Sequence, residues 1–76
     1  MSREMFGCDI DHFMDSIRNS ATYKLSGANM VVAGLMSDAQ EELAMGANER
    51  ARQTLNCAKA VLFEIMEGKL IADVAR

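Results

Sequence analysis

The sequence predicts an all-α protein, and three features support this prediction. The 76 residues contain no proline and only five glycines. The periodic segments are rich in Ala, Leu, Met, Glu, Gln and Arg, which are good helix formers. Runs of the residue types that favour strands are missing, apart from Val31 and Val32. We therefore expect residues 1–76 to form one small helical domain of two or three helices with a central antiparallel hairpin.

The first helix is expected at about residues 9–19. Asp9 is the predicted N-cap, because its carboxylate can accept a hydrogen bond from free amides of the first turn. Apolar residues then recur at helical spacing, at Ile10, Phe13, Met14 and Ile17. Residues 19–27 are poor in helix formers, so we favour a break there, with Ser26 capping the next helix. The alternative is one continuous helix, since apolar residues keep steps of three and four through this segment.

The second and third helices are expected at about residues 28–45 and 48–67. Gly46 can adopt the left-handed conformation that ends a helix, and Asn48 is the predicted N-cap of the third helix. A connection this short makes two helices antiparallel neighbours. The sequence leaves open whether the third helix continues through residues 69–76, where apolar residues still recur at helical spacing.

Two features of these helices concern their packing. Gly34 lies within the second helix, where glycine costs about 1 kcal/mol relative to alanine, so we expect another helix backbone to approach it closely. The third helix has an apolar stripe in steps of four and three, formed by Ala51, Leu55, Ala58, Leu62 and Ile65. We expect this stripe to share a core with Leu43 of the second helix. The apolar faces are wider than one hairpin covers, so we also expect a homodimer with bundle-like packing.

Composition and charge argue against several classes of partner. The net charge of −3 does not favour nonspecific nucleic-acid binding, which requires a basic surface. The longest uncharged run, residues 25–37, is too short to span a bilayer, so no membrane partner is expected. Acidic residues near the start do not fit a signal peptide, and a cytoplasmic location is expected. Cys8 and Cys57 show no CxxC spacing, and we favour two reduced thiols over a single disulfide.

Residues 8–15, CDIDHFMD, contain the one cluster with potential metal ligands. Cys8 and His12 are four residues apart, so they can share a helix face. A structural zinc site requires four ligands, and the rest of the chain offers no second pair of this kind. We therefore favour a capped acidic helix start with a solvent-facing histidine. A metal- or small-ligand-binding bundle that uses Cys8, His12 and nearby carboxylates is the alternative hypothesis.

An enzymatic function is not expected. His12 is the only histidine, and nothing in the sequence arranges a nucleophile and an orienting carboxylate beside it. The segment GANE is a turn without the lysine that a phosphate-binding loop requires. We therefore predict no catalytic, cofactor-binding or metal-binding residues, and no cofactor.

A protein partner is the favoured hypothesis, and six residues are candidates for its binding surface. Met30 and Met45 lie off the main apolar stripes, and methionine side chains repack readily against varied shapes. Phe63 lies beside the stripe of the third helix and is the best candidate for an interface anchor. A small basic patch on the same helix would usually pair with Glu41 or Glu42. The full candidate set is Met30, Met45, Arg50, Arg52, Lys59 and Phe63.

Residues 33–62 resemble a single helical hairpin of the tetratricopeptide type. The run GANERARQTLNCAKAV places Gly46, Ala51, Leu55 and Ala58 at the intervals of the turn glycine and the small-large-small face of such repeats. The sequence departs from the pattern in its first helix, where two charged residues replace an aromatic residue and a leucine. It also lacks the closing proline. The resemblance implies a helical module that binds peptides or proteins, similar to small secretion chaperones and adaptors.

These observations together favour a non-enzymatic interaction protein. Its expected role is that of a small regulator, an inhibitor (phage-encoded inhibitors included) or a chaperone-like adaptor, acting through helix faces on a protein partner.

Overall fold

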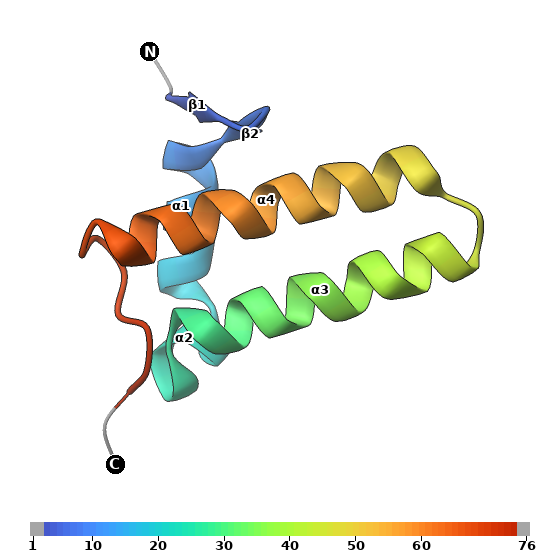
Figure 1. Ribbon diagram of the computed structural model, residues 1–76. Helices are drawn as coiled ribbons and strands as arrows, with labels where there is room; N and C mark the ends of the chain where they lie inside the picture. Colours follow the sequence, from blue (N-terminus) through green and yellow to red (C-terminus); the bar gives the residue numbers. More distant parts are fainter. Residues whose placement is uncertain (1–2, 75–76) are drawn as a thin grey trace.

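The computed structural model of the protein describes residues 3–74 (Figure 1). Within this range the chain forms, in order, β1 (Glu4–Met5), β2 (Cys8–Asp9), α1 (Ile10–Asn19), α2 (Ala21–Ser26), α3 (Ala28–Ala44) and α4 (Asn48–Met66). The predicted all-α class is confirmed, with one small antiparallel hairpin of strands added to it. The sequence did not predict these strands, because two residues are too few to show a periodic pattern.

The helices α3 and α4 form a long antiparallel hairpin, which is the largest feature in Figure 1. Gly46 has a φ of +80° in the turn, as its position predicts. The Ala47 N–H donates to the carbonyl oxygen of Glu42 at 2.8 Å, which closes the end of α3. The predicted N-cap at Asn48 is wrong, because Asn48 is already the first residue of α4. Ala47 occupies the cap position, and no side chain caps α4.

The chain breaks between α1 and α3, as favoured from the sequence. Asp9 caps α1 by accepting a hydrogen bond from the His12 N–H at 3.3 Å, which confirms the predicted start. Ser20 ends α1 and caps the short α2 by accepting from the Tyr23 N–H at 3.2 Å. The continuous-helix alternative is therefore wrong, and α2 is a helix that the sequence did not predict.

The chain after α4 leaves the helix and runs across α2 and the start of α3 (Figure 1). Residues 69–74 are not helical, which answers the open question for this part of the chain, while residues 75–76 lie outside the described residues. The Ile71 N–H donates to the Tyr23 hydroxyl at 3.0 Å, so the segment is fixed to α2.

This segment also supplies the missing cap of α3. The carbonyl oxygens of Ile71 and Ala72 accept from the N–H groups of Ala28 and Asn29 at 2.7 Å and 2.9 Å. These bonds satisfy the first amides of the helix, which would otherwise lack partners. The predicted cap at Ser26 is wrong for this reason: no side chain caps α3, and the distant backbone takes that role.

The core lies between α1 and one side of the α3–α4 hairpin. Its buried members are Cys8, Ile10, Met14, Ile17, Ala28, Val32, Ala58, Ala60, Val61 and Leu70. Leu43, Leu55 and Leu62 are 53%, 38% and 43% exposed, so the prediction that they share a closed core is wrong for a single chain. The physical reason is that α1 covers one side of the hairpin, and these leucines lie on the other.

Gly34 lies in the interior of α3, but no neighbouring segment approaches it. A Cβ atom built at this position meets no atom within 4 Å, so the expected close approach of another helix is wrong within the described chain. Gly34 is exposed and lowers the stability of the helix, and no packing contact in residues 3–74 explains its presence.

The variant Gly34→Ala is therefore expected to be more stable by about 0.5–1 kcal/mol, since alanine loses less backbone entropy on folding. Urea denaturation followed by circular dichroism measures this difference. A loss of stability would show instead that the face of α3 at Gly34 is covered in solution, as in a dimer.

Candidate docking groove

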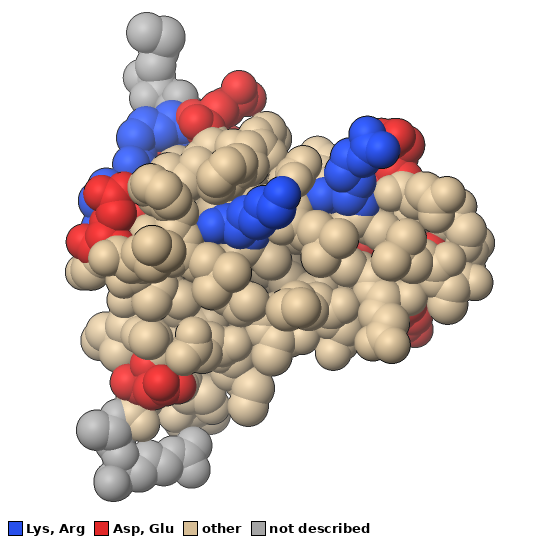
Figure 2. Space-filling view, viewed as in Figure 1, with Lys and Arg blue, Asp and Glu red and all other residues tan. Residues whose placement is uncertain are grey.

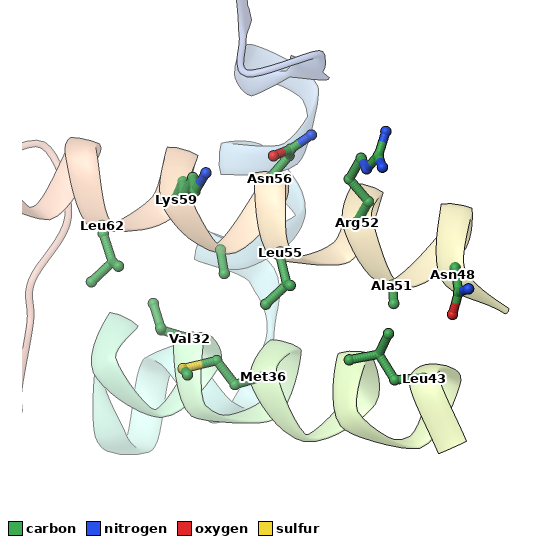
Figure 3. A pocket seen from close by; sticks show the side chains of 11 residues that line it. Val32, Met36, Leu43, Asn48, Ala51, Arg52, Leu55, Asn56, Lys59 and Leu62 are labelled. Atoms are coloured by element: carbon green, nitrogen blue, oxygen red, sulfur yellow. The ribbon is translucent and has the colours of Figure 1, made fainter. Parts of the chain in front are cut away.

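An apolar groove of about 500 Å³ lies between α3 and α4, on the face of the hairpin turned away from α1 (Figure 3). Its apolar lining comes from both helices: Val32, Met36, Leu43, Ala51, Leu55, Ala58 and Leu62. Val32 and Leu43 of α3 point toward α4, Met36 lies along α3, and Leu55 and Leu62 point back toward α3. Ala51 and Ala58 are buried and small, so they leave the groove hollow between the larger side chains.

The large side chains of the groove are only half covered by the chain itself. Besides the three leucines, Met36 is 56% exposed. Full burial of a leucine or methionine side chain contributes about 1.5–3 kcal/mol. Covering the exposed halves of these four side chains would therefore stabilise a complex by roughly 3–6 kcal/mol. Contiguous apolar surface of this kind is typical of an interaction site.

The rim of the groove on α4 is polar and positively charged. Arg52 and Lys59 lie two turns apart on α4, with Asn56 between them, and all three point away from α3 (Figure 3). Figure 2 shows basic side chains across this face of the hairpin and acidic ones mainly toward its edges. Arg52 contacts the exposed Glu49 at 3.8 Å, yet none of the 11 residues that line the groove is acidic. The groove thus combines an apolar floor with charge of one sign.

The structure gathers only part of the predicted partner-binding set at this groove. Arg52 and Lys59 line it directly. Phe63 is 41% exposed and packs edge-on against Phe6 of the β-hairpin, with ring centroids 6.5 Å apart. Arg50 is directed to α3, where its Nε lies 3.6 Å from a carboxylate oxygen of Glu42. The predicted pairing of the basic patch with an acidic residue of α3 is therefore seen at Arg50.

The two candidate methionines are exposed, as predicted, but lie outside the groove. Met30 borders a separate hollow that also involves Phe13 and Ile17 of α1. Met45 is the C-cap residue of α3 and is 78% exposed. Neither side chain lines the space between α3 and α4.

The sequence interpretation missed the apolar walls of the groove. Met36, Leu55 and Leu62 recur at the spacing of a core stripe, and spacing alone does not tell a closed core from an open groove. One signal was available in the width of the apolar faces, from which self-association was expected. A small chain with more apolar residues than its core can hold must leave some at the surface.

The cluster at residues 8–15 does not form a metal site in the structure. Among residues 3–74, no group of three or more His, Cys, Asp or Glu side chains is arranged to hold a metal ion. His12 is exposed. The alternative hypothesis of a metal-binding bundle therefore lacks a ligand set in the described chain.

Cys8 instead meets Cys57, although 49 residues separate them in the sequence. The Cys57 thiol donates to the sulfur of Cys8, with the two Sγ atoms 3.2 Å apart. Both are free thiols, and Cys8, a residue of β2, is buried in the core. Burial and the contact with Cys57 raise the pKa of the Cys8 thiol to about 12, because both disfavour a thiolate there.

Two further findings bear on function. No helix within residues 3–74 combines the length and the hydrophobicity needed to cross a membrane. In comparisons with known proteins, no family model, no curated protein and no solved structure matched the chain.

Proposed function

We propose that this chain is a non-enzymatic protein–protein interaction module whose groove between α3 and α4 binds an amphipathic helix of a partner protein. The observation that carries the proposal is the groove itself: large apolar side chains left half exposed beside Arg52 and Lys59. Helix-in-groove recognition uses this combination, with apolar anchors filling the groove and charges at the rim setting orientation.

The dimensions of the groove fit one helix. The apolar part of its α4 wall extends from Ala51 to Leu62, which at 1.5 Å per residue is roughly 16 Å, or three turns. A partner helix of about this length presents apolar residues at steps of three and four to such a surface. The resemblance to a tetratricopeptide hairpin implies the same class of ligand.

Charge favours a partner helix with acidic residues beside its apolar face. The groove-lining residues include the two cations of α4 and no acid. Lys59 has no ion pair within residues 3–74 at 4.0 Å or less, so its ammonium is available to a carboxylate of the partner. Complementary rim charges raise the association rate and fix the register more than they raise affinity.

A second copy of the chain is the competing occupant, since the sequence predicts a homodimer. Two-fold pairing brings the same surface from both copies together. Such a pairing would add a second set of groove residues, which again contains Arg52 and Lys59 and no acidic side chain. Neither lining would offer an acidic side chain to Lys59, so we favour the acidic partner helix.

We propose that the protein acts in the cytoplasm as a small regulator, inhibitor or chaperone-like adaptor, by binding a helix of its partner.

Two synthetic amphipathic peptides test the proposal. Both carry the same leucine-rich face and the same length, and they differ only in having glutamate or lysine at the flanking positions. The glutamate peptide is expected to bind about tenfold more tightly, because it meets two cations at the rim. Amide chemical shifts of the labelled protein should change along the facing sides of α3 and α4, and fluorescence anisotropy gives the affinities.

The double variant Arg52→Glu/Lys59→Glu is the matched control, and it should reverse the preference between the two peptides. Arg50→Glu should not reverse it, because Arg50 lies outside the groove. Light scattering of the free protein completes the test. A stable dimer that Leu62→Glu converts to monomers would show that a second copy fills the groove, and would overturn the proposal.

A further inference from the structure

We infer that Cys8 and Cys57 are a dithiol site that closes to an intramolecular disulfide when a small disulfide oxidant is present. The inference rests on geometry: the fold brings two free thiols from opposite ends of the sequence to an Sγ–Sγ separation of 3.2 Å. It is independent of the docking groove and of the function proposed for it.

The elements that carry the two thiols make closure feasible. Cys8 lies in β2, which packs against α4, and Cys57 lies on α4. A disulfide requires the sulfur atoms to approach by roughly 1 Å more, to about 2.05 Å. We expect closure to move the β-hairpin rather than α4, because so short a hairpin has little stability of its own.

The exposure of the two thiols sets the order of the reaction. Cys57 is partly exposed, whereas Cys8 is buried. The Cys57 thiolate therefore attacks one sulfur of the oxidant, for example oxidised glutathione, and expels one glutathione thiolate. Cys8 then attacks the Cys57 sulfur and passes its proton to the departing glutathione sulfur, so the second glutathione leaves as a thiol. The protein loses two hydrogen atoms, and one oxidised glutathione becomes two reduced ones.

The disulfide would fix the β-hairpin to α4. The hairpin carries Phe6, which packs on Phe63, and the hollow next to it is lined by Phe6 together with Arg52 and Asn56. Arg52 and Asn56 also line the apolar groove, so the disulfide would fix the β-hairpin beside one edge of the groove. In a reducing compartment the pair stays open, and a rise in oxidant closes it.

The test uses the full chain in glutathione redox buffers, followed by blocking of free thiols and mass spectrometry. We expect the unblocked chain to lose the mass of two hydrogens. Trypsin should release residues 4–18 linked to residues 53–59, since these fragments contain Cys8 and Cys57. The oxidised form should also melt roughly 10 °C higher than the reduced form, because the bridge constrains a long loop of the unfolded chain.

Two serine variants distinguish formation of the intramolecular disulfide from simple reaction of one exposed thiol with glutathione. Cys8→Ser should retain a stable mixed disulfide of glutathione at Cys57, and Cys57→Ser should leave Cys8 slow to react. The inference is overturned if the parent chain also accumulates the mixed disulfide. It is equally overturned if oxidation yields disulfide-linked dimers or leaves the melting temperature unchanged.

Discussion

The variant Gly27→Ala is expected to lower the free energy of unfolding by about 3 kcal/mol, a large part of the total for a domain of this size. Gly27 has a φ of +95°, where side chains are strained, and it is buried at the N-cap of α3. A Cβ at this position would lie 2.5 Å from the carbonyl oxygen of Ala72 and 2.8 Å from the Asp73 Cα. These are backbone atoms, so no side-chain rotation relieves the overlap.

The same substitution would disturb the cap of α3. The backbone around Ala72 accepts the first amides of the helix, and the Val74 N–H donates back to the Ser26 carbonyl oxygen at 3.3 Å. Pushing this segment away exposes the start of α3 and frees the C-terminal end of the described chain. Hydrogen exchange at Ala28 and Asn29 should therefore accelerate in the variant beyond what global destabilisation explains.

Gly46→Ala is the matched control for backbone strain. Gly46 has a similar φ of +80°, but a Cβ there meets no atom within 4 Å. We expect this variant to cost only about 1 kcal/mol, from the left-handed conformation alone. Urea denaturation followed by circular dichroism compares the two. Equal losses would show that the C-terminal segment does not press on α3.

The sequence predicted the elements whose causes are local. Asp9 and Gly46 act through neighbouring amides and carbonyls, so their roles are visible within a few residues. Ser26 and Gly34 were misinterpreted because the deciding partner is distant or missing. The amides beside Ser26 are satisfied by the chain after α4, and no helix in the described chain packs on Gly34.

In the candidate site, too, the sequence predicted the local features and missed those that depend on distant segments. The positive residues at the rim, Arg52 and Lys59, were identified from α4 alone, since charge and helical spacing are local properties. The exposure of Leu55 and Leu62 in an open groove has a different cause. It depends on which side of the α3–α4 hairpin is covered by α1. The meeting of Cys8 with Cys57 likewise depends on the path of the β-hairpin over α4. Helical periodicity carries no information on either arrangement.

Within residues 3–74, Glu64 is the one charged residue that is buried, and the sequence analysis did not identify it. Its side chain is fully buried in α4, where Oε1 accepts from the Arg3 guanidinium at 3.0 Å. Oε2 lies 3.8 Å from the Lys69 ammonium and has no hydrogen bond within the described chain. Burying a carboxylate is costly unless cations compensate it, so these two contacts explain why the residue is tolerated there.

Arg3 also ties this site to the start of α1. Its backbone N–H donates to Asp11 at 2.9 Å and its Nε donates to the same carboxylate at 3.1 Å. These bonds hold the pKa of Asp11 below its ordinary value of 3.8, with the backbone bond as the main cause. The carboxylate is therefore stabilised in the folded state. Its contribution is full above that value and is lost as the pH falls through the lower folded pKa.

The variant Glu64→Lys is expected to lower the free energy of unfolding by about 4 kcal/mol, which approaches global unfolding for this chain. The new ammonium would be buried beside the cations of Arg3 and Lys69. It would be repelled by both and would have no water to solvate it, whereas the carboxylate it replaces is attracted by both. Thermal and urea denaturation measure the loss.

Two control variants distinguish the effect of burying a positive charge from the effect of changing a glutamate near the end of α4. Glu67→Lys makes the same exchange at an exposed site near the end of α4, and it should change stability by less than about 0.5 kcal/mol, since cations are favourable there. Glu64→Met keeps the side-chain length without the charge, and it should cost about 1 kcal/mol or less, because removing a buried ion pair also removes its desolvation cost. If Glu64→Lys matched Glu67→Lys, the carboxylate of residue 64 would have to face solvent. The N-terminal segment would then not be held to α4 through Arg3.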